Sequence, residues 1–254
     1  MLKQIMTPIL LSFAIYLGHL GTVSAEPIPT WIYHQKSYPD GAGPFPAVIV
    51  LHSSGGMRAT RHVLSKFVDS GFSVYFPDFF GRHGITSENR METFSEYRES
   101  IEKELTEIVE LMKKDPKVDK NNIFAVGYSN GGFWAGFLSG KALVNAGVSY
   151  YGVWKACSGS DCENEYPMEY FSENSSPMLA LHGDSDSKQD VFDAESAWDE
   201  IRGSKAKLES HIYKNAEHGW DLGHLPRWKD CCYNKEVTKD AYKRTIAFFK
   251  KHMK

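Results

Sequence analysis

After residue 25 the sequence has no apolar stretch long enough to span a membrane, no internal repeat and no low-complexity segment. It also lacks an excess of charge, because 29 lysines and arginines against 32 aspartates and glutamates give a formal net charge of −3. So mild an acidic balance gives no reason to expect nucleic acid or an anionic membrane as a partner. Aromatic residues are plentiful, at 13%, which disfavours disorder and is typical of a globular domain.

The first 25 residues differ from the rest of the chain. Lys3 gives the segment a positively charged start, and the residues up to Leu20 are mostly apolar. Suitably small residues occupy the last and third-last positions before a cleavage site after Ala25. This pattern predicts a signal peptide, residues 1–25, and export to the periplasm or the cell exterior. An uncleaved membrane anchor is the alternative, because the run is not far short of a membrane span. The remainder, 26–254, has the length of one α/β domain.

Cysteine is scarce, and all four cysteines lie beyond the expected cleavage site, at Cys157, Cys162, Cys231 and Cys232. An even number of cysteines in an exported chain predicts disulfides. Because a ring between adjacent cysteines is strained, we expect Cys231 and Cys232 to pair with Cys157 and Cys162, in either arrangement. Zinc is the alternative, but the two-residue gap of common zinc sites is missing, so no metal is expected.

Short, unbroken apolar runs recur along the chain, as is typical of strands covered on both faces. They lie at 47–51, 72–76, 123–126, 148–153, 178–181 and 208–213. Apolar residues spaced by three and four predict a long helix over 94–112, with Thr93 and Glu96 as a capping box at its start. Shorter helices are expected at 132–138, 191–201 and 237–249. Alternating strands and helices predict an α/β fold with a mainly parallel central sheet flanked by helices.

The strongest chemical signal is the pattern G-x-S-x-G at residues 127–131, centred on Ser129 and followed by Gly132. The pattern ends an apolar run and opens a helical segment, which is the strand–turn–helix setting of a nucleophile elbow. Glycines permit the sharp turn, and the amino terminus of the helix favours developing negative charge. We therefore expect Ser129 to be a nucleophile; a structural serine in a turn is the alternative.

A serine hydroxyl needs a base, and after such an elbow the chain order is acid, then histidine. The apolar run 178–181 leads into a loop that carries Asp184 and Asp186. We favour Asp186, which lies deeper in the loop, over Asp184, which suits bonding to backbone amides of the turn. His218, in the loop before the last helix, is the expected base, with His224 as the alternative. The acidic cluster lacks the glycine and terminal glutamate of an EF-hand loop, so no calcium is expected.

The oxyanion of a tetrahedral intermediate needs hydrogen-bond donors. One should be the amide of Asn130, directly after the nucleophile. The other should come from the glycine-containing loop after the run 47–51, with Ser53 as first choice and Ser54 as second. An ordinary glycine turn is the alternative interpretation of this loop.

Two segments, Gly81–Met91 and Lys155–Ser176, are long enough to shape a pocket. Loops at the carboxyl ends of parallel strands surround the ligand crevice, so we interpret Lys155–Ser176 as a disulfide-tied excursion that walls it. A surface loop without substrate contact is the alternative. We expect aromatic side chains to narrow the crevice and favour small substrates; they are Trp154, Tyr166, Tyr170 and Phe171.

Three further residues are candidates for substrate binding. Arg82 follows an apolar run on the side where the loops gather, and Arg58 follows the expected oxyanion loop. Either guanidinium can bind a substrate carboxylate with two parallel hydrogen bonds. Tyr128, directly before Ser129, is the third candidate. The alternative is that both arginines are solvated surface residues.

Taken together, these residues resemble the dienelactone hydrolase family, from about Trp31 to the carboxyl terminus. The likeness rests on Val50-Leu51-His52 with Gly55-Gly56, Tyr75-Phe76-Pro77-Asp78 before Gly81-Arg82, the motif 127–132, His182-Gly183 before Asp186, and His218-Gly219. The resemblance implies an eight-stranded type of sheet, no cofactor, and hydrolysis of esters or lactones. The best-known members are cytosolic and have a cysteine nucleophile, where this chain has Ser129 and an export signal. Where they place a glutamate near the nucleophile, this chain has His52.

We therefore expect a serine hydrolase that cleaves small carboxylic esters or lactones through an acyl-enzyme. A peptidase or amidase of the same fold is one alternative, because the same triad cleaves amides. A catalytically inactive binding protein on a hydrolase scaffold is another, since a fold does not guarantee an activity. The expected partner is a small-molecule substrate, without nucleic acid and without a membrane anchor once the signal peptide is removed.

Overall fold

The computed structural model describes residues 35–156 and 168–254. Within these ranges, seven strands form one sheet in the order β1-β3-β2-β4-β5-β6-β7. Only β1 runs antiparallel to its neighbour, β3, and the other adjacent strands are parallel. The strands are β1 Gln35–Ser37, β2 Phe45–Leu51, β3 Ser73–Phe76, β4 Val118–Tyr128, β5 Ala146–Tyr150, β6 Met178–Gly183 and β7 Leu208–Tyr213. The mainly parallel sheet is confirmed, with seven strands in these ranges where the resemblance implied eight.

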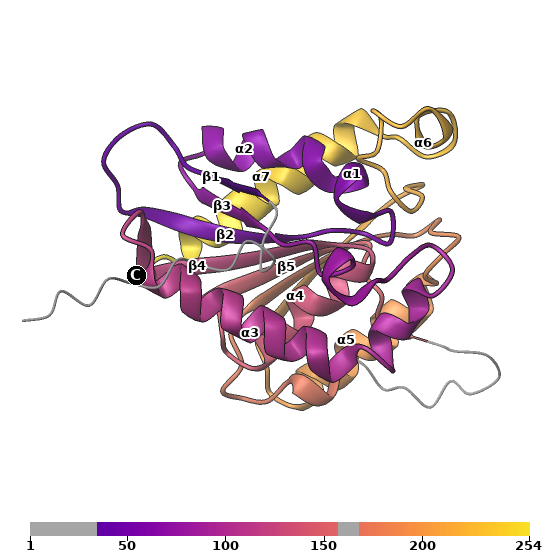
Figure 1. Ribbon diagram of the computed structural model, residues 1–254. Helices are drawn as coiled ribbons and strands as arrows, with labels where there is room; N and C mark the ends of the chain where they lie inside the picture. The colour runs from indigo at the N-terminus through magenta and orange to yellow at the C-terminus, as the bar shows by residue number, and fades with distance from the viewer. Residues whose placement is uncertain (1–34, 157–167) are drawn as a thin grey trace, which may run out of the picture.

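Helices cover both faces of this sheet, so the molecule has three layers (Figure 1). One side carries α1 Gly56–Thr60, α2 Leu64–Asp69 and α7 Lys235–Lys251, and the other carries α3 Arg98–Lys114, α4 Asn130–Gly140 and α5 Val191–Gly203. A short helix, α6 Pro226–Cys231, stands beyond the end of the sheet. The described residues also form four 3₁₀ turns: η1 Arg61–Val63, η2 Gly81–His83, η3 Arg90–Phe94 and η4 Met168–Tyr170. No helix in the described ranges is both long and apolar enough to cross a membrane.

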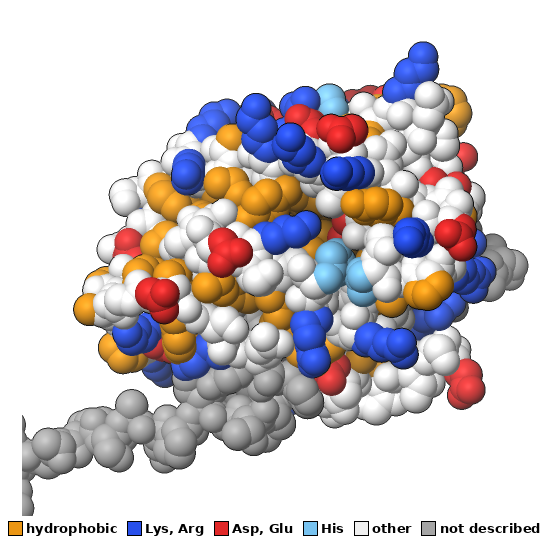
Figure 2. Space-filling view, turned by 90° about the horizontal axis from the view of Figure 1, so that it is seen from above, with side chains coloured by type: hydrophobic (Ala, Val, Ile, Leu, Met, Phe, Trp, Pro, Cys, Tyr) orange, Lys and Arg blue, Asp and Glu red, His pale blue; other side chains and the backbone are white. Residues whose placement is uncertain are grey.

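The central strands are apolar on both faces because each face packs against helices. In β2, Val48 and Val50 belong to the core beneath α2 and α7, whereas Ile49 and Leu51 belong to the core beneath α3 and α4. This alternation follows from the two-residue period of a strand. On the surface seen from above, basic and acidic side chains are interspersed with apolar ones (Figure 2), as the nearly balanced composition suggests.

The start of α3 differs from its sequence prediction. The helix begins at Arg98, its N-cap is Tyr97, and no side chain caps it. Thr93 lies instead in the 3₁₀ turn η3, where its hydroxyl donates to the carbonyl of Arg90 at 2.9 Å. The predicted capping box of Thr93 and Glu96 is therefore wrong, because a separate turn precedes the helix. The predicted signal peptide 1–25, and Cys157, Cys162 and Tyr166, lie outside the described residues.

A buried carboxylate fixes the antiparallel edge of the sheet to the end of α3. Asp115, 7% exposed, accepts hydrogen bonds from Lys36 Nζ at 2.6 Å and from the hydroxyls of Tyr38, also at 2.6 Å, and Tyr75. The amide of Lys117 donates to its other oxygen at 2.8 Å. Burial by itself would raise the pKa of Asp115, but these donors outweigh it and lower the pKa to about 2.

We predict that Asp115→Asn lowers the free energy of unfolding by about 2–3 kcal/mol at pH 7, because the donors lose a charged acceptor. A pKa below the unfolded value of 3.8 means that the ionised form stabilises the fold. This contribution is fully present above about pH 5 and is lost as the pH falls through about 2. Urea unfolding at pH 7 and pH 3 should therefore show a smaller difference from wild type at pH 3. The exposed Asp199→Asn is the control, and an equal effect at both pH values would contradict the assignment.

Candidate active site

The turn between β4 and α4 places Ser129 at the carboxyl edge of the sheet. Ser129 has φ 53° and ψ −114°, a left-handed conformation that is strained for a residue with a side chain. The glycines two positions before and after Ser129 allow the turn only because they lack a Cβ. A Cβ on Gly127 would lie 1.8 Å from the carbonyl oxygen of Gly131, and one on Gly131 would lie 2.2 Å from that of Leu51. The nucleophile-elbow geometry expected from the motif is therefore present.

Ser129, His218 and Asp186 form a continuous chain of hydrogen bonds. Ser129 Oγ lies 2.9 Å from His218 Nε2, and His218 Nδ1 lies 2.8 Å from Asp186 Oδ2. All three come from loops at the carboxyl ends of β4, β7 and β6. Because a carboxylate only accepts, Nδ1 carries the proton, which leaves the lone pair of Nε2 directed at the serine hydroxyl. In this arrangement a histidine can withdraw the proton of a serine.

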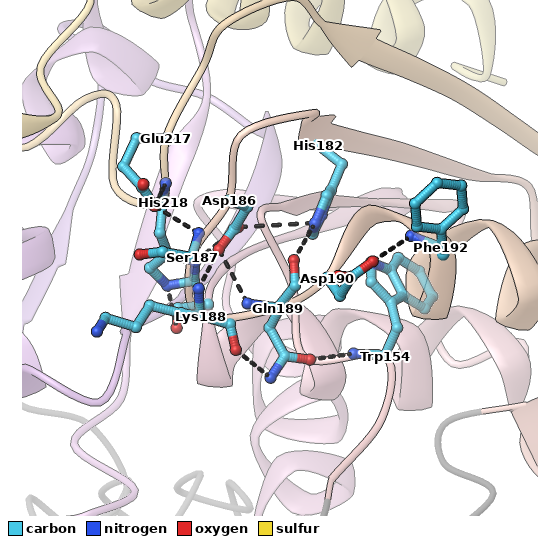
Figure 3. A network of polar contacts seen from close by, with 11 residues as sticks. Trp154, His182, Asp186, Ser187, Lys188, Gln189, Asp190, Phe192, Glu217 and His218 are labelled. Atoms are coloured by element: carbon cyan, nitrogen blue, oxygen red, sulfur yellow. Dashed lines mark hydrogen bonds and ion pairs between the residues drawn. The ribbon is translucent and has the colours of Figure 1, made fainter.

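Asp186 is held as a carboxylate by its surroundings (Figure 3). Its Oδ1 accepts the amides of Lys188 at 2.8 Å and Gln189 at 2.9 Å. Burial would raise the pKa of Asp186, but the hydrogen bond from His218, together with the one from the amide of Gln189, outweighs it and lowers the pKa. The group therefore stays ionised while its side chain is fully enclosed.

Further contacts tie together the loops that follow β5, β6 and β7 (Figure 3). Glu217 Oε1 accepts the amides of Ser187 at 2.7 Å and His218 at 2.8 Å, which joins the loop after β6 to the loop after β7. Gln189 Oε1 accepts the amide of Trp154 at 3.3 Å, and the Gln189 carbonyl accepts His182 Nε2 at 2.9 Å. Burial lowers the pKa of His182, so this ring is neutral and bonds as an Nε2–H donor.

The alternative acid and base have other roles. Asp184 Oδ1 accepts the amide of Asn215 at 2.6 Å, so this side chain supports the turn as the sequence suggested. His224 lies against His62, with ring centroids 4.2 Å apart. In the described ranges, no group of three or more histidine, cysteine or acidic side chains is arranged to hold a metal ion.

The two candidate amides of the oxyanion loop differ in their partners. The amide of Ser53 donates to Thr60 Oγ1 at 3.1 Å. The amide of Ser54 donates to no acceptor within the described residues. His52 bonds the carbonyl of Ser53 through Nδ1 at 2.9 Å and stacks on Phe79 at 3.9 Å. Burial lowers the pKa of His52 to about 4, so the ring is neutral and donates from Nδ1. By this criterion Ser54, the second choice from the sequence, has the more available amide.

Asn130, the first residue of α4, is fixed by its side chain. Its Nδ2 donates to Thr93 Oγ1 at 2.9 Å, and its Oδ1 accepts from Trp134 Nε1 at 3.2 Å. An amide in the first turn of a helix has no partner within the helix, so the backbone N–H of Asn130 is available to a ligand. The clamp between η3 and α4 thus holds this amide beside Ser129.

A cavity of about 700 Å³ opens above Ser129 and His218. Aromatic and aliphatic side chains line it, together with three cationic ones, Arg90, Lys188 and Arg227; the apolar members are Met91, Tyr151, Val153, Leu222 and Trp228. A neighbouring cavity of about 350 Å³ shares Ser53, Gly55, Leu222, Arg227 and Trp228 with it and includes Arg58.

Several residues predicted to contact substrate do not line this cavity. Arg82 Nε lies 3.8 Å from the buried Glu104 Oε2 in an ion pair. Tyr128 is 2% exposed, and its ring packs on Tyr150 at 4.7 Å, because the residue before the nucleophile points back into the core. Three of the four aromatic residues expected to narrow the crevice are instead buried in the core, namely Trp154, Tyr170 and Phe171. The predictions for Tyr128 and for these three aromatic residues are therefore wrong, whereas Arg82 stays a prediction.

The predicted pairing of Cys231 and Cys232 with distant cysteines is also wrong. The two residues are bonded to each other, and both line the large cavity. Ring strain was the argument against this pairing, but the end of α6 fixes both residues, since the amides of Cys232 and Tyr233 donate to the carbonyl of Trp228 at 3.0 and 2.9 Å. Neither cysteine has another sulfur partner in the described ranges.

The family model that describes the dienelactone hydrolase family matches residues 34–253. This chain belongs to the dienelactone hydrolase family. A relative from Yersinia pestis, a candidate carboxymethylenebutenolidase, is 20% identical over 221 residues and covers 83% of this chain and 79% of its own length. By its membership of this family, the chain is a carboxylic ester hydrolase of the dienelactone hydrolase type.

Solved structures with the same fold include a phosphotriesterase and an esterase. A dienelactone hydrolase-like promiscuous phosphotriesterase from metagenomic libraries superimposes with a TM-score of 0.67 at 18% identity, covering 84% of this chain and 89% of its own. The propionate-bound esterase Est2 of Thermogutta terrifontis gives 0.64 at 16% identity, covering 85% and 88%. Both likenesses support the dienelactone hydrolase fold described above.

We predict that Gly131→Ala lowers kcat/KM for ester hydrolysis at least about a hundredfold, because the new Cβ drives the elbow away from the end of β2. It should also lower the free energy of unfolding by about 1–3 kcal/mol through overpacking. Gly203→Ala is the matched control: no atom lies within 4 Å of its added Cβ, so stability should change by less than about 1 kcal/mol. Thermal unfolding and ester kinetics measure both. Full activity in Gly131→Ala would contradict the close-approach argument.

Proposed function

We propose that this chain is a serine esterase that cleaves small carboxylic esters or lactones through an acyl-enzyme on Ser129. The observation that carries the proposal is the unbroken series of hydrogen bonds from Ser129 Oγ through His218 to Asp186, at the floor of a cavity. Each group has the partner that its role requires, and the hydroxyl faces the space a substrate would enter.

In the proposed first half-reaction, His218 Nε2 takes the proton of Ser129 as Oγ attacks the ester carbonyl carbon. Asp186 stabilises the imidazolium that forms and keeps its orientation. The amide of Asn130 and an amide of the loop Ser53–Ser54 donate to the oxyanion. The intermediate then collapses, the bond to the alcohol oxygen breaks, and His218 returns the proton to the leaving alcohol. In a lactone, that alcohol stays attached to the acyl group.

The second half-reaction repeats these steps with water. His218 Nε2 accepts a proton from a water molecule as its oxygen attacks the acyl carbon. The same amides bind the second oxyanion. Collapse of this intermediate breaks the bond to Ser129 Oγ, which recovers its proton from His218 and releases the carboxylic acid.

The cavity favours compact substrates. Its volume of about 700 Å³ lies within the range of small-molecule sites, and its apolar lining includes Tyr151 and Trp228. Est2, which has the same fold, has been solved with propionate and with butyrate bound. By analogy we propose short acyl groups for this chain, without the long hydrocarbon chains of lipase substrates.

The charges on the cavity wall favour a substrate with a carboxylate away from the reacting ester. Arg90 and Arg227 both line the cavity, and Lys188 adds a third positive charge. The one acidic side chain among the lining residues, Glu217, already accepts two backbone amides. Two guanidinium groups can bind a carboxylate more strongly than neutral donors can.

We predict that Ser129→Ala and His218→Ala each lower kcat at least about a thousandfold, since members of a triad act as a unit. Paraoxon should phosphorylate the peptide that contains Ser129 in wild type, as it does Est2, and not in Ser129→Ala. Steady-state kinetics and peptide mass spectrometry measure the two effects. Asp186→Asn should be severely impaired, with Asp184→Asn as the matched control within about threefold of wild type. An unlabelled serine would point to an inactive scaffold, and the reverse order of the aspartate variants would reassign the acid.

We predict that Arg90→Ala and Arg227→Ala each lower kcat/KM about tenfold or more for an ester that carries a remote carboxylate, such as a monoalkyl succinate. A charge-assisted hydrogen bond contributes roughly 1.5–3 kcal/mol, which sets this size. The neutral butyrate ester of the same alcohol should change less than about threefold. Arg202→Ala, whose guanidinium bonds Asp199 on the surface, is the control. Equal losses on the anionic and neutral esters would refute the proposed charge selection.

A further inference from the structure

The disulfide between Cys231 and Cys232 lies on the wall of the cavity that contains Ser129 and His218. Trp228, one turn earlier in α6, lines the same wall. Cys231 Sγ lies 3.9 Å from the carbonyl oxygen of Trp228, and because a disulfide sulfur carries no proton, it cannot serve as a proton donor to the series of Ser129, His218 and Asp186. The disulfide therefore faces substrate space without belonging to the proton-transfer chain.

The segment that carries the disulfide begins at His218. Gly219, with φ +71°, follows His218, and a Cβ on it would lie 2.8 Å from the ring of Trp228. A Cβ on Gly223 would lie 2.7 Å from the ring of Tyr233. These two glycines let the segment fold back closely on its own aromatic rings. The position of the wall is thus coupled to the position of His218.

The far end of the segment is also fixed. The amide of Asn234 donates to the carbonyl of Trp220 at 2.9 Å, and Asn234 caps α7 by accepting the amide of Val237 at 3.1 Å. Cys231 thus ends α6, and Cys232 precedes the Asn234 cap, which ties the segment to the body of the fold. The disulfide has a defined place in the wall.

The chemistry of this wall suits a flat, unsaturated group. The two sulfurs are polarisable and apolar, and their residues line the cavity together with Trp228. Sulfur makes favourable contacts with aromatic rings, worth about 0.3–1.5 kcal/mol each. A saturated alkyl group gains less from such a surface than an aryl or conjugated group does, because its electrons are less polarisable.

We propose that the Cys231–Cys232 disulfide is a specificity-determining element that, with Trp228, binds an aromatic or conjugated part of the ester substrate. This inference rests on the proposed esterase function of the same cavity. It assigns the disulfide to substrate selection, with no covalent step at either sulfur. Opening the disulfide should weaken binding of flat substrates while the chemistry at Ser129 continues.

The test compares purified wild-type protein with Cys231→Ser/Cys232→Ser on phenyl acetate, ethyl benzoate and ethyl acetate. We expect KM for the two aromatic esters to rise about two- to tenfold, the size of a lost sulfur–aromatic contact, with a smaller change for ethyl acetate. The kcat values should change less than KM. Paraoxon labelling of Ser129 in each protein reports the proposed function separately, so a failure of catalysis is distinguished from a failure of selectivity.

A phosphine reductant provides the matching experiment on the unmodified chain. The phosphine becomes a phosphine oxide with the oxygen of one water molecule, whose two protons go to the two thiols as the S–S bond gains two electrons. Reduced wild type should reproduce the KM changes of the double variant, and the double variant should not respond to the reductant. Cys157→Ser/Cys162→Ser is the control and should keep the response.

Three outcomes would overturn the proposal. The first is a folded double variant in which the ratio of the aromatic-ester KM to the ethyl acetate KM is the same as in wild type. The second is a double variant that still responds to the reductant. The third is a Cys157→Ser/Cys162→Ser control that no longer responds. Circular dichroism establishes folding in each protein. If the double variant does not fold, the reductant experiment on wild type and on the control variant decides alone.

Discussion

The close approach of two backbone segments is the constraint on which the site depends. The elbow between β4 and α4 passes so near the end of β2 that only glycine fits at residue 131. This contact sets Ser129, the proposed nucleophile, beside the loop that follows β2, where His52 in turn fixes the carbonyl of Ser53. Ser129 then has to adopt a left-handed conformation that its side chain disfavours. The strain is sustained because the sheet on one side and α4 on the other leave the backbone no alternative path.

The remaining parts of the site come from loops that are bonded to one another. Glu217 joins the acid loop to the base loop through two backbone amides, and Gln189 joins the acid loop to the segment after β5. These contacts connect backbone to side chain, so they fix loop positions more directly than contacts between two long side chains would. A parallel sheet supplies this opportunity because its strands end along a common edge.

Sequence reasoning identified the residues whose meaning is local or follows from chain order. The elbow motif, the aspartate after β6 and the histidine after β7 are brought together as expected. It failed where a side chain's direction decides the outcome. Tyr128 is adjacent to Ser129, yet strand alternation turns its ring into the core. The wall formed by α6 was missed because a helix of six residues leaves no periodic pattern to detect.

Helix α4 has a consequence for how the chain reaches its native state. Every one of its residues is buried, so it has no face that could remain in water. Eleven residues with four glycines cannot hold a helix in isolation, because nucleation is unfavourable and glycine weakens propagation. Its apolar surface must therefore be covered by strands and by α3 as it forms, through contacts between distant parts of the sequence. Folding is then governed by long-range assembly, and intermediates that expose this segment are prone to aggregate before the sheet closes over it.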